Sequence, residues 1–361
     1  MKPVSRCLPL LDVLRDPACM AALALRDWDL LLRQAAAAGL LSRIAVQADK
    51  LGLTTVIPDV VQPHLTAART LANKQRQAVR WEARRIAQAL AGIDGPVLLL
   101  KGAAYAIADL PPAAGRLFGD IDILVPHPQL GQVEAALMLA GWHSQKQDDY
   151  DQRYYRRWMH ELPPMTHIRR GTVLDVHHNL LPETARIRTH AAPILAAAQA
   201  LADPPGLSIP ANTDLVLHSA CHLFHEGEWG HGLRDLVDLD ALLRAFATEP
   251  TFWSTLLARA KLLNLGRPLY YALDCCQRWL HTPIPANVIP NCPHRPPAWQ
   301  RAIMRNLFDA GLGSAHRSCH GRLPKLATFA LYIRGHYLRM PWHLLLPHLL
   351  HQARRRNQEQ G

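Results

Sequence analysis

The sequence has no CxxC pair, no HExxH motif and no uninterrupted apolar run of the ~20 residues that a transmembrane helix needs. Its 7 cysteines have no disulfide-like spacing, so reduced thiols are the simplest interpretation. Near the start of the chain, Arg15 and Asp16 interrupt the apolar run too early for the core of a signal peptide. We therefore expect a cytoplasmic protein without an integral membrane segment.

Acidic residues are also scarce. The 361 residues include 29 Asp and Glu against 40 Lys and Arg, which gives a formal net charge of +11. This excess favours anionic partners such as nucleotides, nucleic acid, phosphosugars or a lipid surface. Because it is spread over arginine-rich helical segments and the tail, we interpret it as a general bias and not as a nucleic-acid-binding face. The absence of repeats and of low-complexity tracts indicates a folded globular chain.

Periodicity divides the chain into three parts. Helical spacing of apolar residues runs through 8–92, where it predicts one long helix over 27–53 and a second ending near Gly92. At "GPVLLLKGAAYAIADL" the pattern changes to a short buried strand, a tight turn and a helix, followed by strand, helix, strand and strand. A Pro-rich link, "LADPPGLSIPAN", leads back to helices. We expect an α+β fold, with an N-terminal helical region over 1–92, a small mixed β-sheet core over 93–200 and a C-terminal helical region over 212–361.

Two aspartates interrupt the apolar strand "DIDILV". Side chains at i and i+2 of a strand share a face, so Asp120 and Asp122 point to one side while Ile121 and Ile123 can pack on helices. Buried carboxylates are costly without a cation, and their hard oxygens suit Mg²⁺ or Mn²⁺. In "TVLDVHHNL", Asp175 adds a third carboxylate on another strand. Three such groups can hold two metal ions that clamp the attacking and leaving oxygens of a phosphoryl transfer.

The stretch "LLLKGAAYA" carries groups suited to a phosphate. Gly102, directly after a strand, lets backbone N–H groups approach closely, and the start of a helix adds a favourable dipole. Lys101 and Arg116 are cations placed to meet the charge of a triphosphate. Each has a simpler alternative, namely Lys101 as a solvated strand end and Arg116 as a structural partner of Asp120.

The order of an apolar strand, "KG", a helix, an arginine, "DIDILV" and "LDVHHNL" resembles the DNA polymerase beta-type nucleotidyltransferase superfamily. More narrowly, it is similar to a bacterial family of nucleotidyltransferases whose members read "LKGaa", an arginine, "DiDlLV" and "iDlHw". The flanking helices "DWDLLLRQAAAAGLLSRI" and "LHSACHLFHEGEWGHGLRDLVDLDALL" also resemble that family. The resemblance covers roughly residues 25–245.

This resemblance implies that Asp120 and Asp122 form the metal pair and that Asp175 is the third carboxylate, which helps to activate an acceptor hydroxyl. It places Gly102 at the phosphate turn. It implies Mg²⁺-dependent transfer of a nucleoside monophosphate from an NTP, either ATP or CTP, with release of pyrophosphate. The acceptor stays open between a protein side chain, an RNA end, a sugar and a small molecule. One departure stands out, because the usual small hydroxylated residue after the glycine is Ala103 in this chain.

Several histidines are further candidates. His177 shares a face with the third carboxylate, so it either supports the site, contacts the acceptor or is structural. His218 and His222 lie one helical turn apart and could ligate a metal or contact the acceptor. The alternative is that they pack against the α/β core and pair with Asp235 or Asp238.

Two other functions stay open at this point. Because Ala103 removes a hydroxyl contact, the chain could be a catalytically silent module that binds nucleotide or a partner. A hydrolase with Zn²⁺ held by His218 and His222 is a further alternative. The basic C-terminal stretch "YLRMPWHLLLPHLLHQARRR" has apolar residues with basic flanks, and we favour its docking on the protein body over contact with a membrane surface.

Overall fold

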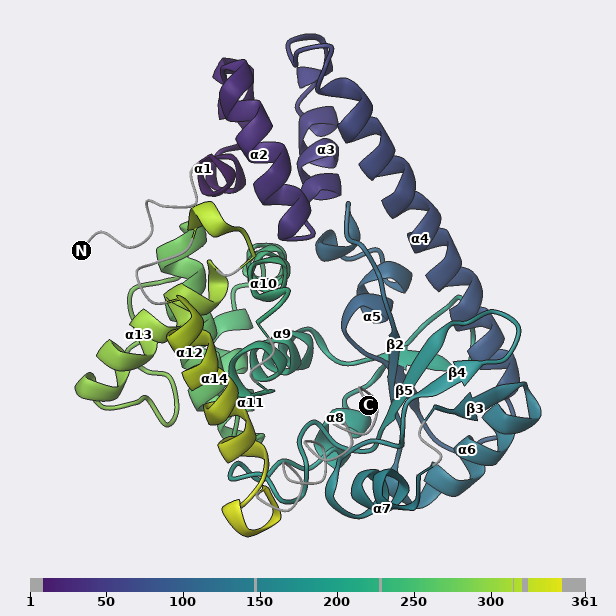
Figure 1. The fold of residues 1–361 in the computed structure, drawn as a ribbon. Helices are drawn as coiled ribbons and strands as arrows, with labels where there is room; N and C mark the ends of the chain where they lie inside the picture. The colour runs from purple at the N-terminus through teal and green to yellow at the C-terminus, as the bar shows by residue number, and fades with distance from the viewer. Residues whose placement is uncertain (1–8, 146–147, 227–228, 314, 320–323, 346–361) are drawn as a thin grey trace, which may run out of the picture.

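The computed structural model describes residues 9–145, 148–226, 229–313, 315–319 and 324–345. These residues form an α+β protein in which a seven-stranded mixed sheet lies between a long N-terminal helix and a C-terminal group of helices (Figure 1). The fold class expected from the sequence is therefore confirmed. Within the described parts of the chain, no helix combines the length and apolar character needed to span a bilayer.

Four helices precede the sheet, and they are α1 (Leu10–Arg15), α2 (Leu25–Ala37), α3 (Leu41–Lys50) and α4 (Gln62–Ala89). The single helix expected over 27–53 is wrong, because Gly39 adopts a left-handed φ of 67° that ends α2 before α3 begins. The second long helix is present as α4. Three arginines of α4 form ion pairs in addition to facing solvent. Arg76 and Arg80 pair with Asp109, and Arg84 pairs with Asp203.

The sheet has the order β3-β4-β5-β2-β1-β7-β6. In its centre β2 runs parallel to β5 and antiparallel to β1, and Ile121 and Ile123 of β2 are buried as expected. The strands are β1 (Val97–Leu99), β2 (Ile121–Leu124), β3 (Trp142–Ser144), β4 (Met165–His167), β5 (Val173–His177), β6 (Gln199–Ala200) and β7 (Leu207–Ile209). Among the described residues, four α-helices lie between the first and the last of these strands, namely α5 (Lys101–Ile107), α6 (Leu130–Leu139), α7 (Asp149–Trp158) and α8 (Ala192–Ala196).

The Pro-rich stretch that the sequence indicated as a link contributes β7 to the sheet, and β6 directly precedes it. Strand β7 pairs parallel with β1 and aligns Leu207 with Val97. Leu207 and Ile209 are buried on either side of the partly exposed Ser208, a period-two pattern that is too short to recognise between prolines. The sheet therefore continues past residue 200 to Ile209.

The C-terminal helices are α9 (Asn212–Cys221), α10 (Gly232–Phe246), α11 (Phe252–Leu262), α12 (Gly266–Leu280), α13 (Ala298–Leu312) and α14 (Pro324–Arg339). A π-helical turn, η6 (His222–Glu226), continues α9. Helix α14 docks on the protein body, because the backbone N–H of Arg186 donates to Leu338 O at 2.9 Å and Thr184 Oγ1 donates to Arg339 O at 2.9 Å. The rest of the basic stretch, from residue 346, lies outside the described residues.

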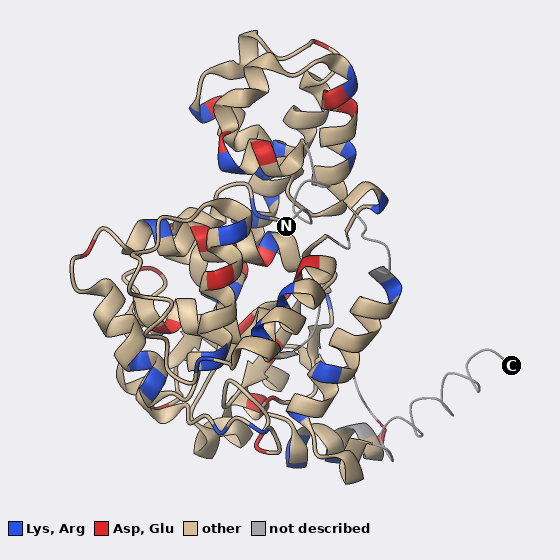
Figure 2. Ribbon diagram, turned by 90° about the vertical axis from the view of Figure 1, so that its left-hand side faces the viewer, with Lys and Arg blue, Asp and Glu red and all other residues tan. Residues whose placement is uncertain are grey.

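Charged positions are distributed over the whole fold. In Figure 2, lysines and arginines are scattered among acidic residues and do not gather in one block. This distribution agrees with the interpretation of the net charge as a general bias.

Candidate active site

The strand register brings the three candidate carboxylates together. Because β2 and β5 are parallel and Asp122 is paired with Asp175, both side chains project from the same face of the sheet. Asp120 precedes Asp122 by two residues and joins them on that face. One oxygen from each of the three carboxylates lies within 4.8 Å of the others, a grouping able to hold a metal ion.

Asp175 has the electrostatic environment of a cation ligand. It is half-buried, and its Oδ1 is buried without a hydrogen-bond partner among the described residues. Burial, together with the charges of Asp122 and Glu161, raises the pKa of Asp175 to about 7. An unpartnered carboxylate oxygen beside two other carboxylates, with oxygen donors only, fits a hard divalent cation such as Mg²⁺ or Mn²⁺.

Asp122 is already compensated by two groups. Lys101 Nζ lies 2.9 Å from Asp122 Oδ1, and His177 Nε2 lies 3.1 Å from the same oxygen. Burial alone would raise the pKa of Asp122, but Lys101 and His177 hold it well below the ordinary value. Lys101 reaches this position from a left-handed backbone, with φ of 45° at the junction of β1 and α5. In this structure Lys101 is thus neither a solvated strand end nor free of the carboxylates.

His177 connects the carboxylates to a fourth acidic residue. Its Nδ1 lies 3.2 Å from Glu161 Oε2, so the imidazole bridges Glu161 and Asp122. Burial would lower the pKa of His177, but the hydrogen bond to Asp122 and the charge of Glu161 raise it. The sequence reasoning missed Glu161. The polar pair His160-Glu161 was a usable signal, but only the β-bridge between Glu161 and His177 reveals which strand it faces.

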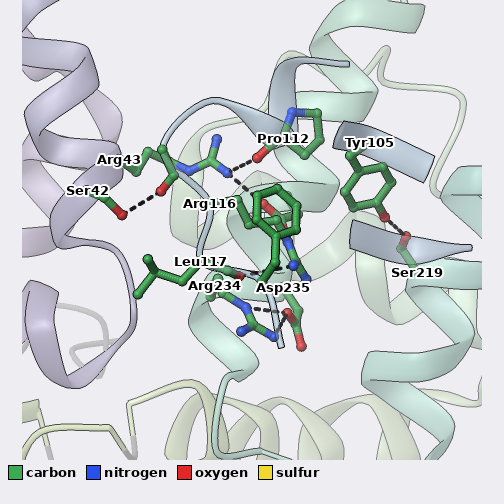
Figure 3. Close-up of polar contacts among 12 residues, drawn as sticks. Ser42, Arg43, Tyr105, Pro112, Arg116, Leu117, Ser219, Arg234 and Asp235 are labelled. Carbon is green, nitrogen blue, oxygen red and sulfur yellow. Dashed lines mark hydrogen bonds and ion pairs between the residues drawn. The ribbon is translucent and has the colours of Figure 1, made fainter. Parts of the chain in front are cut away.

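Arg116 is held by a carboxylate that the sequence did not assign to it. Its Nε lies 2.8 Å from Asp238 Oδ2 on α10. The structural partner suggested by the sequence was Asp120 instead. Asp238 Oδ1 in turn accepts from Arg43 of α3 at 2.7 Å, and Figure 3 shows Arg43 and Arg116 approaching one another from separate segments. Burial would lower the pKa of Arg116, but the acidic neighbours on α10 raise it.

Gly102 leaves room for this arginine. A Cβ at Gly102 would lie 2.5 Å from Arg116 Nη1 and 3.2 Å from a ring carbon of Phe118. The guanidinium also lies over the rings of Tyr105 and Phe118 at 5.9 and 5.5 Å. A Cβ at this position would therefore force the Arg116 guanidinium to shift, apart from any approach of a phosphate.

These residues share one cavity of about 760 Å³. Of the candidates from the sequence, Ala103 and His218 do not line it. Ala103 is 2% exposed, so a hydroxyl on the side chain at this position would be buried. Candidates that do line the cavity are Lys101, Gly102, Arg116, Asp120, Asp122, Asp175, His177 and His222, and residues that were not assigned to a site include Tyr105, Glu161, Arg234 and Arg339.

His218 and His222 have different environments. His218 is 4% exposed, and its burial together with the charge of Lys101 lowers its pKa to about 3. His222 lies in the first turn of η6 and lines the cavity. Among the described residues, the groups able to hold a metal are Asp120, Asp122 and Asp175, and His160, Glu161 and His177, so neither His218 nor His222 belongs to one. Asp238 pairs with arginines, and Asp235 with Arg234.

The fold and cavity define an α+β protein whose sheet gathers three carboxylates able to hold a metal ion. A family model described as an uncharacterised nucleotidyltransferase matches residues 24–281. The match covers more than half of the chain, and the chain therefore belongs to this nucleotidyltransferase family. No curated protein matches the sequence significantly. The family assignment confirms the nucleotidyltransferase part of the resemblance found in the sequence.

Proposed function

We propose that the protein transfers a nucleoside monophosphate from an NTP to an acceptor hydroxyl and releases pyrophosphate. The observation that carries the proposal is the register of β2 and β5, which aligns Asp122 with Asp175 and adds Asp120 on the same face. In the reaction, a bond forms between the acceptor oxygen and the α-phosphorus, and the bond from that phosphorus to the bridging oxygen breaks. The acceptor proton is lost and the leaving group is pyrophosphate.

Asp120, Asp122 and Asp175 are the residues that we assign to the metal. When bound there, Mg²⁺ or Mn²⁺ would neutralise charge on the phosphates and on the attacking and leaving oxygens. The unpartnered Oδ1 of Asp175 supports this assignment, because a half-buried carboxylate without a donor is otherwise unfavourable. It also gives Asp175 an oxygen that can accept a hydrogen bond from the acceptor hydroxyl and orient it.

We assign the phosphates of the NTP to the Lys101–Gly102 turn and Arg116. The guanidinium is charged, borders the cavity and is fixed by Asp238 before any ligand arrives. Lys101 lines the same cavity, where its ammonium group could contact a phosphate in place of Asp122. His177 is a positioning residue, since its Nε2 holds Asp122 while its Nδ1 contacts Glu161.

A labelling experiment tests the proposal. Protein is incubated with each of four α-³²P-labelled NTPs, Mg²⁺ or Mn²⁺, and cell extract as the source of acceptors. Because Asp120 is exposed, Asp120→Asn should fold, and we expect it to lower label transfer by on the order of 10³-fold. Asp94→Asn is the matched control, an exposed aspartate outside the cavity whose change should leave transfer intact.

The other outcomes separate the alternatives. Metal-dependent nucleotide binding without transfer to any acceptor would favour a silent binding module. Nucleotide hydrolysis that survives Asp120→Asn and is lost with a zinc chelator would favour the hydrolase.

A cytoplasmic location is part of the proposal, and the six free cysteines among the described residues support it.

A further inference from the structure

A second cavity lies among the C-terminal helices, apart from the three aspartates. Its volume is about 590 Å³, and small-molecule sites have volumes on the order of 300–1,000 Å³. Its walls come from α12, α13, α14, the turn η6 and the segment around Ile187. The described residues that line it are all different from those lining the first cavity. Occupancy of this second cavity can therefore be tested without changing the candidate active site.

Three arginines give the second cavity an uncompensated positive charge. Arg186, Arg267 and Arg334 line it, and none of the described lining residues is acidic. None of the three forms an ion pair with a carboxylate of the described chain. This contrasts with arginines in neighbouring helices, where Arg259 pairs with Asp214 and Arg278 with Asp274. An anion would supply the counter-charge that the protein does not.

Arg334 is held in place by groups that do not neutralise it. Its Nη1 donates to Phe224 O at 2.8 Å, and its guanidinium lies 5.8 Å from the Tyr271 ring and 5.5 Å from the Phe308 ring. Burial lowers the pKa of Arg334 to about 10, so it stays a cation at neutral pH. A partly desolvated, fixed cation of this kind attracts an anion more strongly than a solvated surface arginine does.

Part of the remaining wall is apolar and exposed. Trp299 and Ile303 lie one turn apart on α13 and are 67% and 53% exposed. Across the cavity, the Arg186 guanidinium stacks on the Tyr337 ring at 3.7 Å. Large apolar side chains that stay this exposed beside a cavity are typical of a ligand-binding surface. The exposed flat ring of Trp299 favours a ligand with a planar apolar body over a purely ionic one.

We propose that this second cavity binds a small organic anion. A carboxylate, phosphate or sulfonate group would meet Arg186, Arg267 and Arg334, and a flat apolar body would pack on Trp299 and Ile303. This site is separate from the proposed transfer reaction and does not depend on it. The chain's own tail is a poor occupant, because its residues 354–356 are three arginines and would add like charge.

Two fluorescent probes of the same shape test the charge requirement. 1-Anilinonaphthalene-8-sulfonate carries the anionic group, and N-phenyl-1-naphthylamine has the same rings without it. In the double variant Arg186→Gln with Arg267→Gln, both positions are exposed, so the fold should be kept. We expect the dissociation constant of the anionic probe to rise about tenfold while that of the neutral probe changes by less than about twofold. Arg26→Gln, at a side chain 90% exposed on α2, is the control and should change neither.

A third variant tests the location. Ile303→Trp narrows the cavity from an exposed wall position, so it should weaken both probes while the circular dichroism spectrum and thermal midpoint stay unchanged. Unchanged binding of the anionic probe in the arginine double variant would overturn the proposal, and so would unchanged binding of both probes in Ile303→Trp. Neither result would affect the labelling experiment on Asp120.

Discussion

At the scale of single residues, Asp122 illustrates how neighbouring side chains compensate the charge of a buried carboxylate in a strand. It is 3% exposed, yet Lys101 and His177 both contact its Oδ1. Lys101 supplies the positive charge that burial of the carboxylate requires. A metal ion bound as we propose would compete with Lys101 for this oxygen, so Lys101 would be a counter-ion of Asp122 before the metal binds and a phosphate ligand afterwards.

We predict that Gly102→Ala impairs nucleotide binding through Arg116. The new Cβ would lie 2.5 Å from Arg116 Nη1, so the guanidinium must move or strain the turn. The KM for the NTP in the transfer assay should rise about tenfold, with a loss of stability on the order of 1–3 kcal/mol.

Gly119→Ala is the matched control, because Gly119 borders the same cavity and a Cβ there would meet nothing within 4 Å. Equal KM values for the two variants would contradict the role given to Arg116. Stability is read separately from urea unfolding curves, so that a change in binding is not mistaken for partial unfolding.

We predict from the lowered pKa of His218 how the free energy of unfolding depends on pH. Its pKa in the folded protein is lowered to about 3 from an ordinary value of 6.5, so the unfolded chain binds a proton there before the folded protein does. The free energy of unfolding should therefore fall as pH decreases below 6.5, by about 2 kcal/mol at pH 5 from this group alone. Urea unfolding from pH 7 to pH 5 measures this dependence.

The variant His218→Gln should flatten that dependence, whatever it does to stability at pH 7. His143→Gln, at an exposed histidine of β3, should leave the dependence as in the parent protein. An unchanged slope in His218→Gln would mean that other groups account for the loss of stability in acid.

The candidate site could be predicted from the sequence only as far as local periodicity reaches. Alternation in "DIDILV" and "TVLDVHHNL" is enough to place Asp120, Asp122 and Asp175 on strand faces. The partners of Lys101 and Arg116 could not be predicted in this way. They depend on contacts with residues 21 and 122 positions away, which the packing of separate elements decides.

At the scale of elements, helix α3 is hydrogen-bonded to the loop that carries Arg116. Ser42 Oγ donates to Gly115 O at 2.7 Å, and Arg43 donates to Pro112 O at 2.6 Å. A Cβ at Gly115 would lie 2.6 Å from the backbone oxygen of Ser42, so the helix and loop pack backbone to backbone. The N-terminal helices thereby support one wall of the cavity.

Gly115→Ala should loosen this contact. Gly115 has a left-handed φ of 68° and no space for a Cβ, so we predict a loss of about 3 kcal/mol or more in the free energy of unfolding. Gly52→Ala is the matched control, with a φ of 65° and nothing within 4 Å of the added atom. It should cost only about 1 kcal/mol, the price of the backbone conformation alone. Similar losses, measured by urea unfolding, would argue against close packing of α3 on the loop.

Elements with a clear local pattern were predictable, whereas β7 was not. Helix α4 extends over 28 residues, so its period is evident, and the two successive strands expected at the end of the core are present as β4 and β5. Strand β7 has only three residues between prolines and glycine, and its pairing with β1 joins segments about 110 residues apart in the chain. Such non-local pairing leaves no local signal in the sequence.

At the scale of the whole molecule, a bound metal should stabilise the fold. The three aspartates come from two strands at the centre of the sheet, and only the folded chain brings them together. At a Mn²⁺ concentration about 100 times the dissociation constant, we expect about 2.7 kcal/mol of added stability, seen as a higher thermal midpoint. Asp175→Asn should lose most of this rise.

Asp94→Asn removes one negative charge from an exposed position outside the cavity, so it should respond to Mn²⁺ as the parent protein does. If the midpoint of Asp175→Asn rose with Mn²⁺ as much as that of the control, the aspartate group could not be the metal site. The same comparison needs no knowledge of the acceptor.

The position of β7 has a practical consequence for anyone who shortens the chain. Without the segment after residue 200, one side of β1 would have no neighbour, and bare backbone groups at a sheet edge promote self-association. A truncated version intended for crystallisation or spectroscopy should therefore extend at least through Ile209, even though a cut among the preceding prolines looks natural.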